Sequence, residues 1–102
     1  MKTIWKVRLV QAVGSQEIKV PVGFKPLHVD FQDDEGSGFS INSLYVWGEV
    51  FPENPVEPIS MYIVGTGQEV PDGVSKHYKY IGTAVSASWV WHVYVQDKAI
   101  NT

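Results

Sequence analysis

The sequence predicts an all-β domain, a small antiparallel sandwich or partly open barrel of about seven short strands. Three observations support this fold class. Apolar side chains recur every second residue along most of the chain, which is the spacing that sends alternate side chains to opposite faces of a strand. No segment has the 3.6-residue period that a long helix requires. The apolar runs are short, and turns rich in Gly, Pro, Asp and Ser separate them.

Three strands are expected in the first third of the chain. Residues 4–12 and 16–20 alternate in polarity, and the pair Gly14-Ser15 between them predicts a hairpin. A third alternating run covers residues 27–31, and the polar turn at residues 33–38 ends it.

The longest β-rich run, residues 39–51, is apolar on both faces, so we expect it to be a central strand. Pro52, Pro55 and Pro58 follow it. Because proline lacks the amide donor that a central strand needs, we expect this segment to be a loop. Three further strands complete the domain, at residues 59–64, 78–85 and 89–96.

Length and composition limit what this domain can be. The 102 residues make a single β domain, residues 1–102, with four tryptophans available for its core. There is no Cys and the three His lack the short spacings of a zinc site, so no metal and no other cofactor is expected. A net charge of −3 argues against duplex nucleic acid as a partner. Residues 1–8 carry three charges where a signal peptide would be apolar, and no apolar run is long enough to cross a membrane, so a cytoplasmic location is expected.

The stretch IVGTGQEVPDG, residues 63–73, is the first candidate for a binding site. Gly65-Thr66-Gly67 follows an apolar run, as a phosphate-binding loop would, but the third glycine and the helix of such loops are absent. Pro71 and the Asp72-Gly73 pair would break a helix that began there. We therefore expect a bulged turn, although its glycine amides beside Thr66 could also hold an anion without a helix.

The run WVWHVY, residues 89–94, is the second candidate. On a strand, Trp89 and Trp91 share one face, whereas His92 and Tyr94 share the opposite face. If the tryptophan face packs inward, His92 and Tyr94 point outward and can stack on or hydrogen-bond a ligand. The alternative is a half-buried histidine that the backbone satisfies.

Other chemistry-bearing residues match no catalytic pattern. The acidic cluster at residues 30–35 lacks the ligand spacing of a calcium loop, and a solvated turn explains it. Ser40, Ser43 and Ser60 lack the GxSxG context of a nucleophilic serine. No catalytic residue is assigned, and a binding protein is favoured over an enzyme.

Several short motifs, in a fixed order, resemble a family of small proteins of tailed bacteriophages and prophages. The most specific part is GTG at 65–67, YIGT at 80–83 and VWHVY at 90–94. The resemblance covers nearly the whole chain and includes Thr3-Ile4-Trp5-Lys6, Ile18 with Pro21 and Gly23, Leu27-x-Val29-x-x-Gln32, Leu44 to Trp47, the proline-rich link and Pro71. Family members often carry His after the GTG, where this chain has Gln68, which argues against acid–base chemistry there. The resemblance implies phage origin and a small β fold, but no activity.

Phage origin favours an accessory protein of the host cytoplasm, such as a counter-defence factor that binds a host protein or sequesters a nucleotide-like small molecule. Backbone amides and hydroxyls beside aromatic faces suit such a ligand. The expected binding residues are Thr66, Gly67, Tyr80, Thr83, Trp91 and His92. Two alternatives stay open: a structural or assembly component of the virion, and a small hydrolase or lyase that uses His92 on a nucleotide signal. A homo-oligomer is also expected, because a domain of this size has limited interior to cover both faces of residues 39–51.

Overall fold

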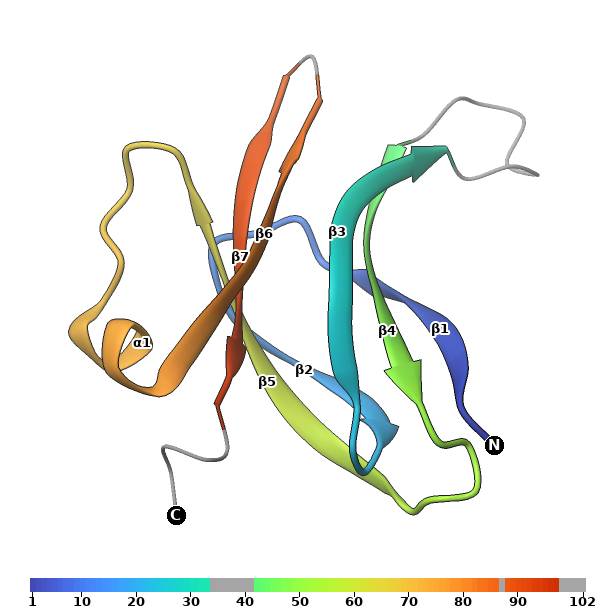
Figure 1. Ribbon diagram of the computed structural model, residues 1–102. Helices are drawn as coiled ribbons and strands as arrows, with labels where there is room; N and C mark the ends of the chain where they lie inside the picture. Colours follow the sequence, from blue (N-terminus) through green and yellow to red (C-terminus); the bar gives the residue numbers. More distant parts are fainter. Residues whose placement is uncertain (34–41, 87, 98–102) are drawn as a thin grey trace.

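Two antiparallel sheets pack face to face in the computed structural model, which describes residues 1–33, 42–86 and 88–97 (Figure 1). The all-β sandwich is therefore confirmed, and the two sheets do not close into a barrel. One sheet has the order β1-β4-β3, built from Thr3–Leu9, Asn42–Val50 and Lys25–Asp33. The other has the order β2-β5-β7-β6, built from Gly14–Pro21, Val56–Gly65, Val90–Gln96 and Tyr78–Val85.

The core lies between the sheets and is made by every second residue of each strand, as the alternation predicts. On β5, Ile59, Met61 and Ile63 are buried, and on β7 the buried residues are Trp91, Val93 and Val95. The three-stranded sheet contributes Leu9, Val29, Leu44 and Val46 to the same cluster. Branched aliphatic side chains fit a pleated, buried surface well, which explains why these segments form strands. The predicted turn at 34–38 and the first residues of the predicted strand 39–51 lie outside the described residues.

The expected hairpin between the first two strands is wrong. β1 pairs with β4 and β2 pairs with β5, so the two strands lie in different sheets. The connection is closed by Gln16, whose side chain accepts a hydrogen bond from the backbone N–H of Val10 and donates one to the carbonyl of the same residue. Leu9 and Ile18 are both buried, and the apolar faces of the two strands meet across the core instead of side by side.

The proline-rich segment is a loop only in part. β5 begins at Val56 and therefore includes Pro58, which is paired with Lys19 of β2. The pairing of β5 with β7 begins only at Met61. Pro58 therefore has a partner strand on one side only among the described residues, and a proline is tolerated where one ladder, not two, must be made.

β4 is the central strand of its sheet, as predicted, and its outer face is covered within the chain. Tyr45 is buried although it lies on the outer face, and the ammonium group of Lys6 lies 4.5 Å from the centre of its ring. Trp47 lies between Tyr45 and His28, with ring centroids 5.9 and 5.8 Å away. Side chains of neighbouring strands thus cover part of the apolar surface that we expected a second copy of the protein to cover. Self-association stays a prediction.

A short helix, α1 (Asp72–His77), was not expected, because Pro71 and Gly73 were taken to break a helix. Proline is compatible with a helix start, where its missing N–H has no intrahelical partner. The Pro71 carbonyl accepts the N–H groups of Val74 and Ser75, both at 3.0 Å. Val74 is buried, and α1 lies on the side of the four-stranded sheet away from the other sheet (Figure 1).

The last three strands pair within one sheet, but not in sequence order. β7 lies between β5 and β6, so β6 and β7 form a hairpin and β7 closes onto β5. The link through α1 runs over the outer face of the sheet and brings the chain to the far side of β7 (Figure 1). The expected simple meander is therefore wrong, while the expected proximity of these strands is confirmed. No helix of the described residues is long and apolar enough to span a bilayer.

Candidate functional site

The GTG segment forms a tight turn at the end of β5. The N–H of Gln68 donates to the carbonyl of Gly65 at 3.1 Å, which closes a four-residue turn. Gly67, the third residue of this turn, has a φ of +85°, and Thr66 before it does not have a positive φ. This combination is that of a type II turn, in which the third position favours glycine. The glycine is therefore needed first for the backbone conformation.

The side chain of Gln68 also supports the turn. Its Oε1 accepts the N–H of Gly65 at 2.7 Å, so two hydrogen bonds join the ends of the four-residue segment. The turn holds Thr66 at its tip, and the Thr66 side chain is exposed. The two hydrogen bonds that close the turn therefore fix the position from which the Thr66 hydroxyl is presented.

The outer face of the four-stranded sheet carries His92 toward this turn. In the strand register, His92 lies opposite Val64 of β5 on one side and opposite Thr83 of β6 on the other. Directly paired residues of antiparallel strands share a face, so these three side chains lie in one row. Trp91 and Val93 are buried in the core, so His92 and Tyr94 lie on the outer face of the sheet, where both are half-buried. The alternative of a half-buried histidine therefore holds for its burial, although threonine side chains and not the backbone bond its ring.

Four of the six expected binding residues form one continuous hydrogen-bond chain. Thr66 Oγ1 lies 2.8 Å from Nε2 of His92, and Thr83 Oγ1 lies 2.8 Å from Nδ1. The hydroxyl of Tyr80 is hydrogen-bonded to the hydroxyl of Thr83. Tyr80 also packs edge to face on Tyr94, with ring centroids 5.6 Å apart. Both ring nitrogens of His92 are thus fixed by side chains from two neighbouring segments.

The hydrogen-bond chain from Thr66 through His92 to Thr83 can form with either neutral tautomer of His92. A neutral imidazole has one N–H donor and one acceptor nitrogen, so one threonine hydroxyl donates to His92 and the other accepts from it. When Nδ1 donates to Thr83, Nε2 accepts the hydroxyl proton of Thr66. The exposed Thr66 oxygen can then accept a further hydrogen bond. With the opposite tautomer, Nε2 donates to Thr66, and the Thr66 hydroxyl proton is available to a ligand acceptor.

Trp91 lies on the other face of the sheet from His92, because neighbouring residues of a strand alternate. The expectation that the two side chains line one surface together is therefore wrong. Trp91 instead stacks in parallel on Trp89, with ring centroids 5.6 Å apart and an angle of 7° between the ring planes. Its Nε1 is buried and has no hydrogen-bond partner among the described residues. Trp89 is 57% exposed, so one face of this indole pair can be reached by a ligand.

A cleft of about 300 Å³ joins the GTG turn to the two tryptophans. Trp91 borders it from the beginning of β7, and Thr66 contributes to it from the turn. Hydroxyl, amide and indole groups dominate its lining, and no Lys, Arg, Asp or Glu is among them. The lining residues are Gly65, Thr66, Gln68, Ser88, Trp89, Val90 and Trp91. Gly67 is not among them, and a Cβ added there would meet nothing within 4 Å.

Five lining residues were not among the expected binding residues, namely Gly65, Gln68, Ser88, Trp89 and Val90. For Gln68, the available signal was its place three residues after Gly65, from which a polar side chain can bond back to the backbone. For Trp89, the signal was its position two residues before Trp91 on the same strand face. No sequence signal pointed to Ser88, which enters the cleft only because the β6–β7 connection folds beside the GTG turn.

In the comparison with known proteins, the chain matches over residues 1–102 a family model that is described as a domain of unknown function, DUF7352. No curated protein and no solved structure matches the chain. Because the match extends over the whole length of the chain, the protein belongs to the DUF7352 family.

Proposed function

We propose that this protein is an accessory binding protein of phage origin that captures a nucleotide-like small molecule in the host cytoplasm, in the manner of a counter-defence factor. The phage setting rests on the resemblance of the GTG, YIGT and VWHVY segments to phage proteins. The ligand class rests on the cleft between the GTG turn and the tryptophans. Capture of a host protein through the same surface is the other form of this proposal.

One observation carries the proposal: an exposed indole, Trp89, borders the same cleft as Thr66, the residue at one end of the hydroxyl–imidazole hydrogen-bond chain. Trp89 offers an aromatic face on which a nucleobase can stack, and such stacking contributes about 1–3 kcal/mol per base. Thr66 offers a hydroxyl whose orientation is set by His92. An aromatic surface beside a few fixed polar groups is typical of small-molecule sites.

The charge of the site indicates which nucleotide-like ligands suit it. Because the lining residues include no Lys or Arg, a phosphate would be held by hydroxyls and backbone amides, without a countercharge from the lining. This favours a nucleoside or a ligand with a single phosphodiester charge over a triphosphate. A triphosphate would bring several negative charges to a protein whose net charge is already −3.

Thermal melts with a panel of nucleosides, mononucleotides and cyclic dinucleotides test this proposal. A ligand that binds only the folded state raises the free energy of unfolding, by about 2.7 kcal/mol when its concentration is a hundredfold above Kd. The melting temperature rises as a result. We expect at least one member of the panel to raise it, and Thr66→Ala and His92→Ala to reduce the rise. Thr3→Ala and His28→Ala are matched controls, because both residues lie on the other sheet.

In these melts, the absence of a shift with every nucleotide would contradict the small-molecule form of the proposal. An equal loss of the shift in the control variants would also contradict it, because the effect would then not depend on the cleft.

A second candidate function is hydrolysis of a nucleotide signal, which the Thr66–His92 hydrogen bond favours. A hydroxyl at 2.8 Å from an imidazole nitrogen, with a third group on the other nitrogen, is the arrangement of an activated nucleophile. The third group here is the Thr83 hydroxyl, whereas a carboxylate usually stabilises the charged imidazole. Chromatographic detection of a hydrolysis product that Thr66→Ser retains and Thr66→Ala abolishes would support this candidate. Recovery of the ligand unchanged after long incubation would contradict it.

A further inference from the structure

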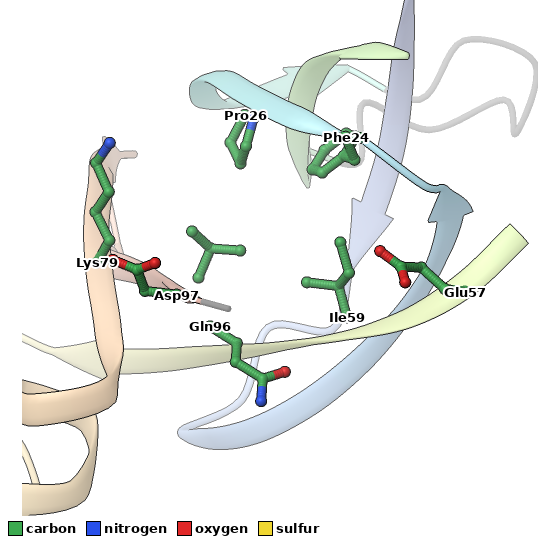
Figure 2. Close-up of a pocket in the computed structure, with 9 residues that line it drawn as sticks. Phe24, Pro26, Glu57, Ile59, Lys79, Gln96 and Asp97 are labelled. Atoms are coloured by element: carbon green, nitrogen blue, oxygen red, sulfur yellow. The ribbon is translucent and has the colours of Figure 1, made fainter. Parts of the chain in front are cut away.

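The four-stranded sheet has two edge strands, β6 and β2, and the edge of β2 is the open one. β6 lies against β3 of the other sheet, where a Cβ added at Gly82 would be 3.4 Å from Cβ of Val29. β2 pairs only with β5 among the described residues. In Figure 2, a close-up of a cavity between the sheets, β2 ends beside Glu57 of β5, and Lys79 of β6 lies on the opposite side of the cavity. The outer edge of β2 can therefore accept another strand.

Backbone hydrogen bonds show which residues of β2 direct their N–H and C=O groups to this edge. The N–H of Val22 donates to the carbonyl of Pro55 at 2.8 Å, in continuation of the register between β2 and β5. Hydrogen-bonded positions alternate along an antiparallel strand, so every second residue counted back from Val22 bonds to β5. The backbone groups of Glu17 and Lys19 therefore point to the open edge. Lys19 lies opposite Pro58, which agrees with this assignment because proline has no N–H to donate.

The same two residues carry opposite charges on one face of the strand. Glu17 and Lys19 are exposed, whereas Ile18 between them is buried in the core. Neither charged side chain makes an ion pair or a side-chain hydrogen bond within the parts of the chain that the structure describes. The open edge thus presents one negative and one positive group, two positions apart, beside unpaired backbone groups.

We propose that β2 pairs edge to edge with β2 of a second copy of this chain, antiparallel and about a two-fold axis at Ile18. In this register Glu17 of each copy lies opposite Lys19 of the other. The nearest registers that also use the open backbone groups place Glu17 opposite Glu17, or Lys19 opposite Lys19. Opposite charges that face each other across a strand pair stabilise it, and like charges destabilise it. A two-fold interface repeats each contact, so a single register gives two favourable ion pairs.

The contact that this pairing makes is short. Each of the two ion pairs lies on a residue pair that exchanges two backbone hydrogen bonds. The ladder ends at Pro21, which has no N–H and whose carbonyl already accepts the N–H of Phe24 at 3.2 Å. Val13 and Val22 flank the strand and are 48% and 42% exposed, and the antiparallel arrangement brings Val13 of one copy toward Val22 of the other. An interface of this size is weak, so we expect a Kd on the order of 100 µM.

The edge of the other sheet at β1 lacks this self-complementarity. The charged residues within β1 are Lys6 and Arg8, and the strand has no acidic residue. Two copies of β1 would offer only like charges to each other, which is a common means of keeping an edge strand from pairing. The inference therefore commits to β2. It does not rest on the nucleotide proposal, because neither Glu17 nor Lys19 lines the cleft beside the GTG turn.

Sedimentation equilibrium of the full-length protein and of charge-reversal variants tests the pairing. Glu17→Lys and Lys19→Glu should each weaken self-association by at least about tenfold, because each variant turns both ion pairs into pairs of like charge. Glu69→Lys is the matched control. It makes the same change of net charge at an exposed position after the GTG turn, and it should leave the Kd unchanged.

An equimolar mixture of the Glu17→Lys and Lys19→Glu variants is the most specific sample. In a mixed pair, the two lysines of one variant face the two glutamates of the other, so the mixture should associate about as tightly as the wild type. A variant that had lost its fold would not regain association in this way, so the mixture also controls for folding.

Amide hydrogen exchange locates the contact along the chain. The N–H groups of Glu17 and Lys19 point to solvent in a single copy and are hydrogen-bonded in the pair, so their exchange should slow as the protein concentration rises. The amide of Glu69 lies away from this edge and should exchange at the same rate throughout.

Four results would overturn the proposal. They are a wild-type protein that stays monomeric at about 1 mM, an association that neither charge reversal weakens, a mixture that does not restore association, and an effect of Glu69→Lys as large as that of Glu17→Lys. An association that neither reversal weakens would place the contact on another surface, such as the outer face of β4.

Discussion

Replacement of Gly67 by alanine separates the backbone role of the GTG turn from a role in binding. At a φ of +85° the added Cβ meets nothing within 4 Å, so the cost comes from the backbone conformation and not from a clash. A Cβ in the left-handed region costs about 1–2 kcal/mol. For a domain of this size, each kcal/mol corresponds to about 4–8 °C in melting temperature. We therefore expect Gly67→Ala to lower the melting temperature by roughly 4–16 °C.

Gly73→Ala is the matched control for this measurement. Gly73 lies in α1, its φ is not positive, and an added Cβ there also meets nothing within 4 Å. Alanine is favoured over glycine in a helix by about 0.5–1 kcal/mol, so this variant should be more stable than the wild type. Differential scanning calorimetry of the two variants should thus give shifts of opposite sign. A Gly67→Ala variant as stable as the wild type would refute the assignment of a type II turn.

Three further predictions concern packing and binding. Gly48→Ala should lower the free energy of unfolding by about 1–3 kcal/mol in a chemical denaturation experiment, because the added Cβ would lie 2.2 Å from Cε1 of Phe24 and 2.9 Å from the Lys25 carbonyl. If Phe24→Leu in the same chain does not restore part of this loss, the clash is not the cause. Thr66→Ala should change the melting temperature of the free protein by less than about 4 °C, because its hydrogen bond to His92 is exposed and contributes little; a larger loss would give the Thr66–His92 bond a structural role. The affinity for a nucleotide-like ligand, measured by calorimetry, should change less than about threefold between 50 and 300 mM salt, since no cation lines the cleft, and a steep dependence would indicate another binding surface.

Much of the fold follows from the pattern of apolar residues. The strand at residues 78–85 begins and ends where the sequence predicts it, and the two-sided apolar run before Phe51 is the central strand of its sheet. The alternation shows which residues share a face, but it does not show which strand lies alongside. For this reason β1 and β2 were predicted as a hairpin, although their apolar faces meet across the core.

The short helix and the strand order were beyond the sequence for a related reason. α1 has six residues, too few for a helical period to be visible, and its formation depends on the burial of Val74 against the sheet. Once α1 carries the chain across the outer face, β7 can take the place beside β5. A local pattern does not contain this long-range choice.

Of the six expected binding residues, Thr66 and Trp91 line the cleft, whereas its exposed indole, Trp89, was not assigned to the site. Thr66, Tyr80, Thr83 and His92 were expected together and are joined by hydrogen bonds, because their strands pair as neighbours. Trp91 was assigned to the same surface, but strand alternation places it on the other face. The exposed indole of the cleft is Trp89, whose accessibility depends on where β7 begins.

The most direct test of the proposed binding site uses the four tryptophan indole N–H groups as separate reporters in a ¹H–¹⁵N spectrum. Trp89 and Trp91 border the cleft, whereas Trp5 and Trp47 belong to the other sheet. On addition of a nucleotide that stabilises the protein, we expect the indole signal of Trp89 and the backbone amides of residues 65–68 to shift, while the signals of Trp5 and Trp47 stay in place. Shifts confined to Trp5 or Trp47, or no indole shift at saturation, would contradict the assignment of the cleft as the binding site.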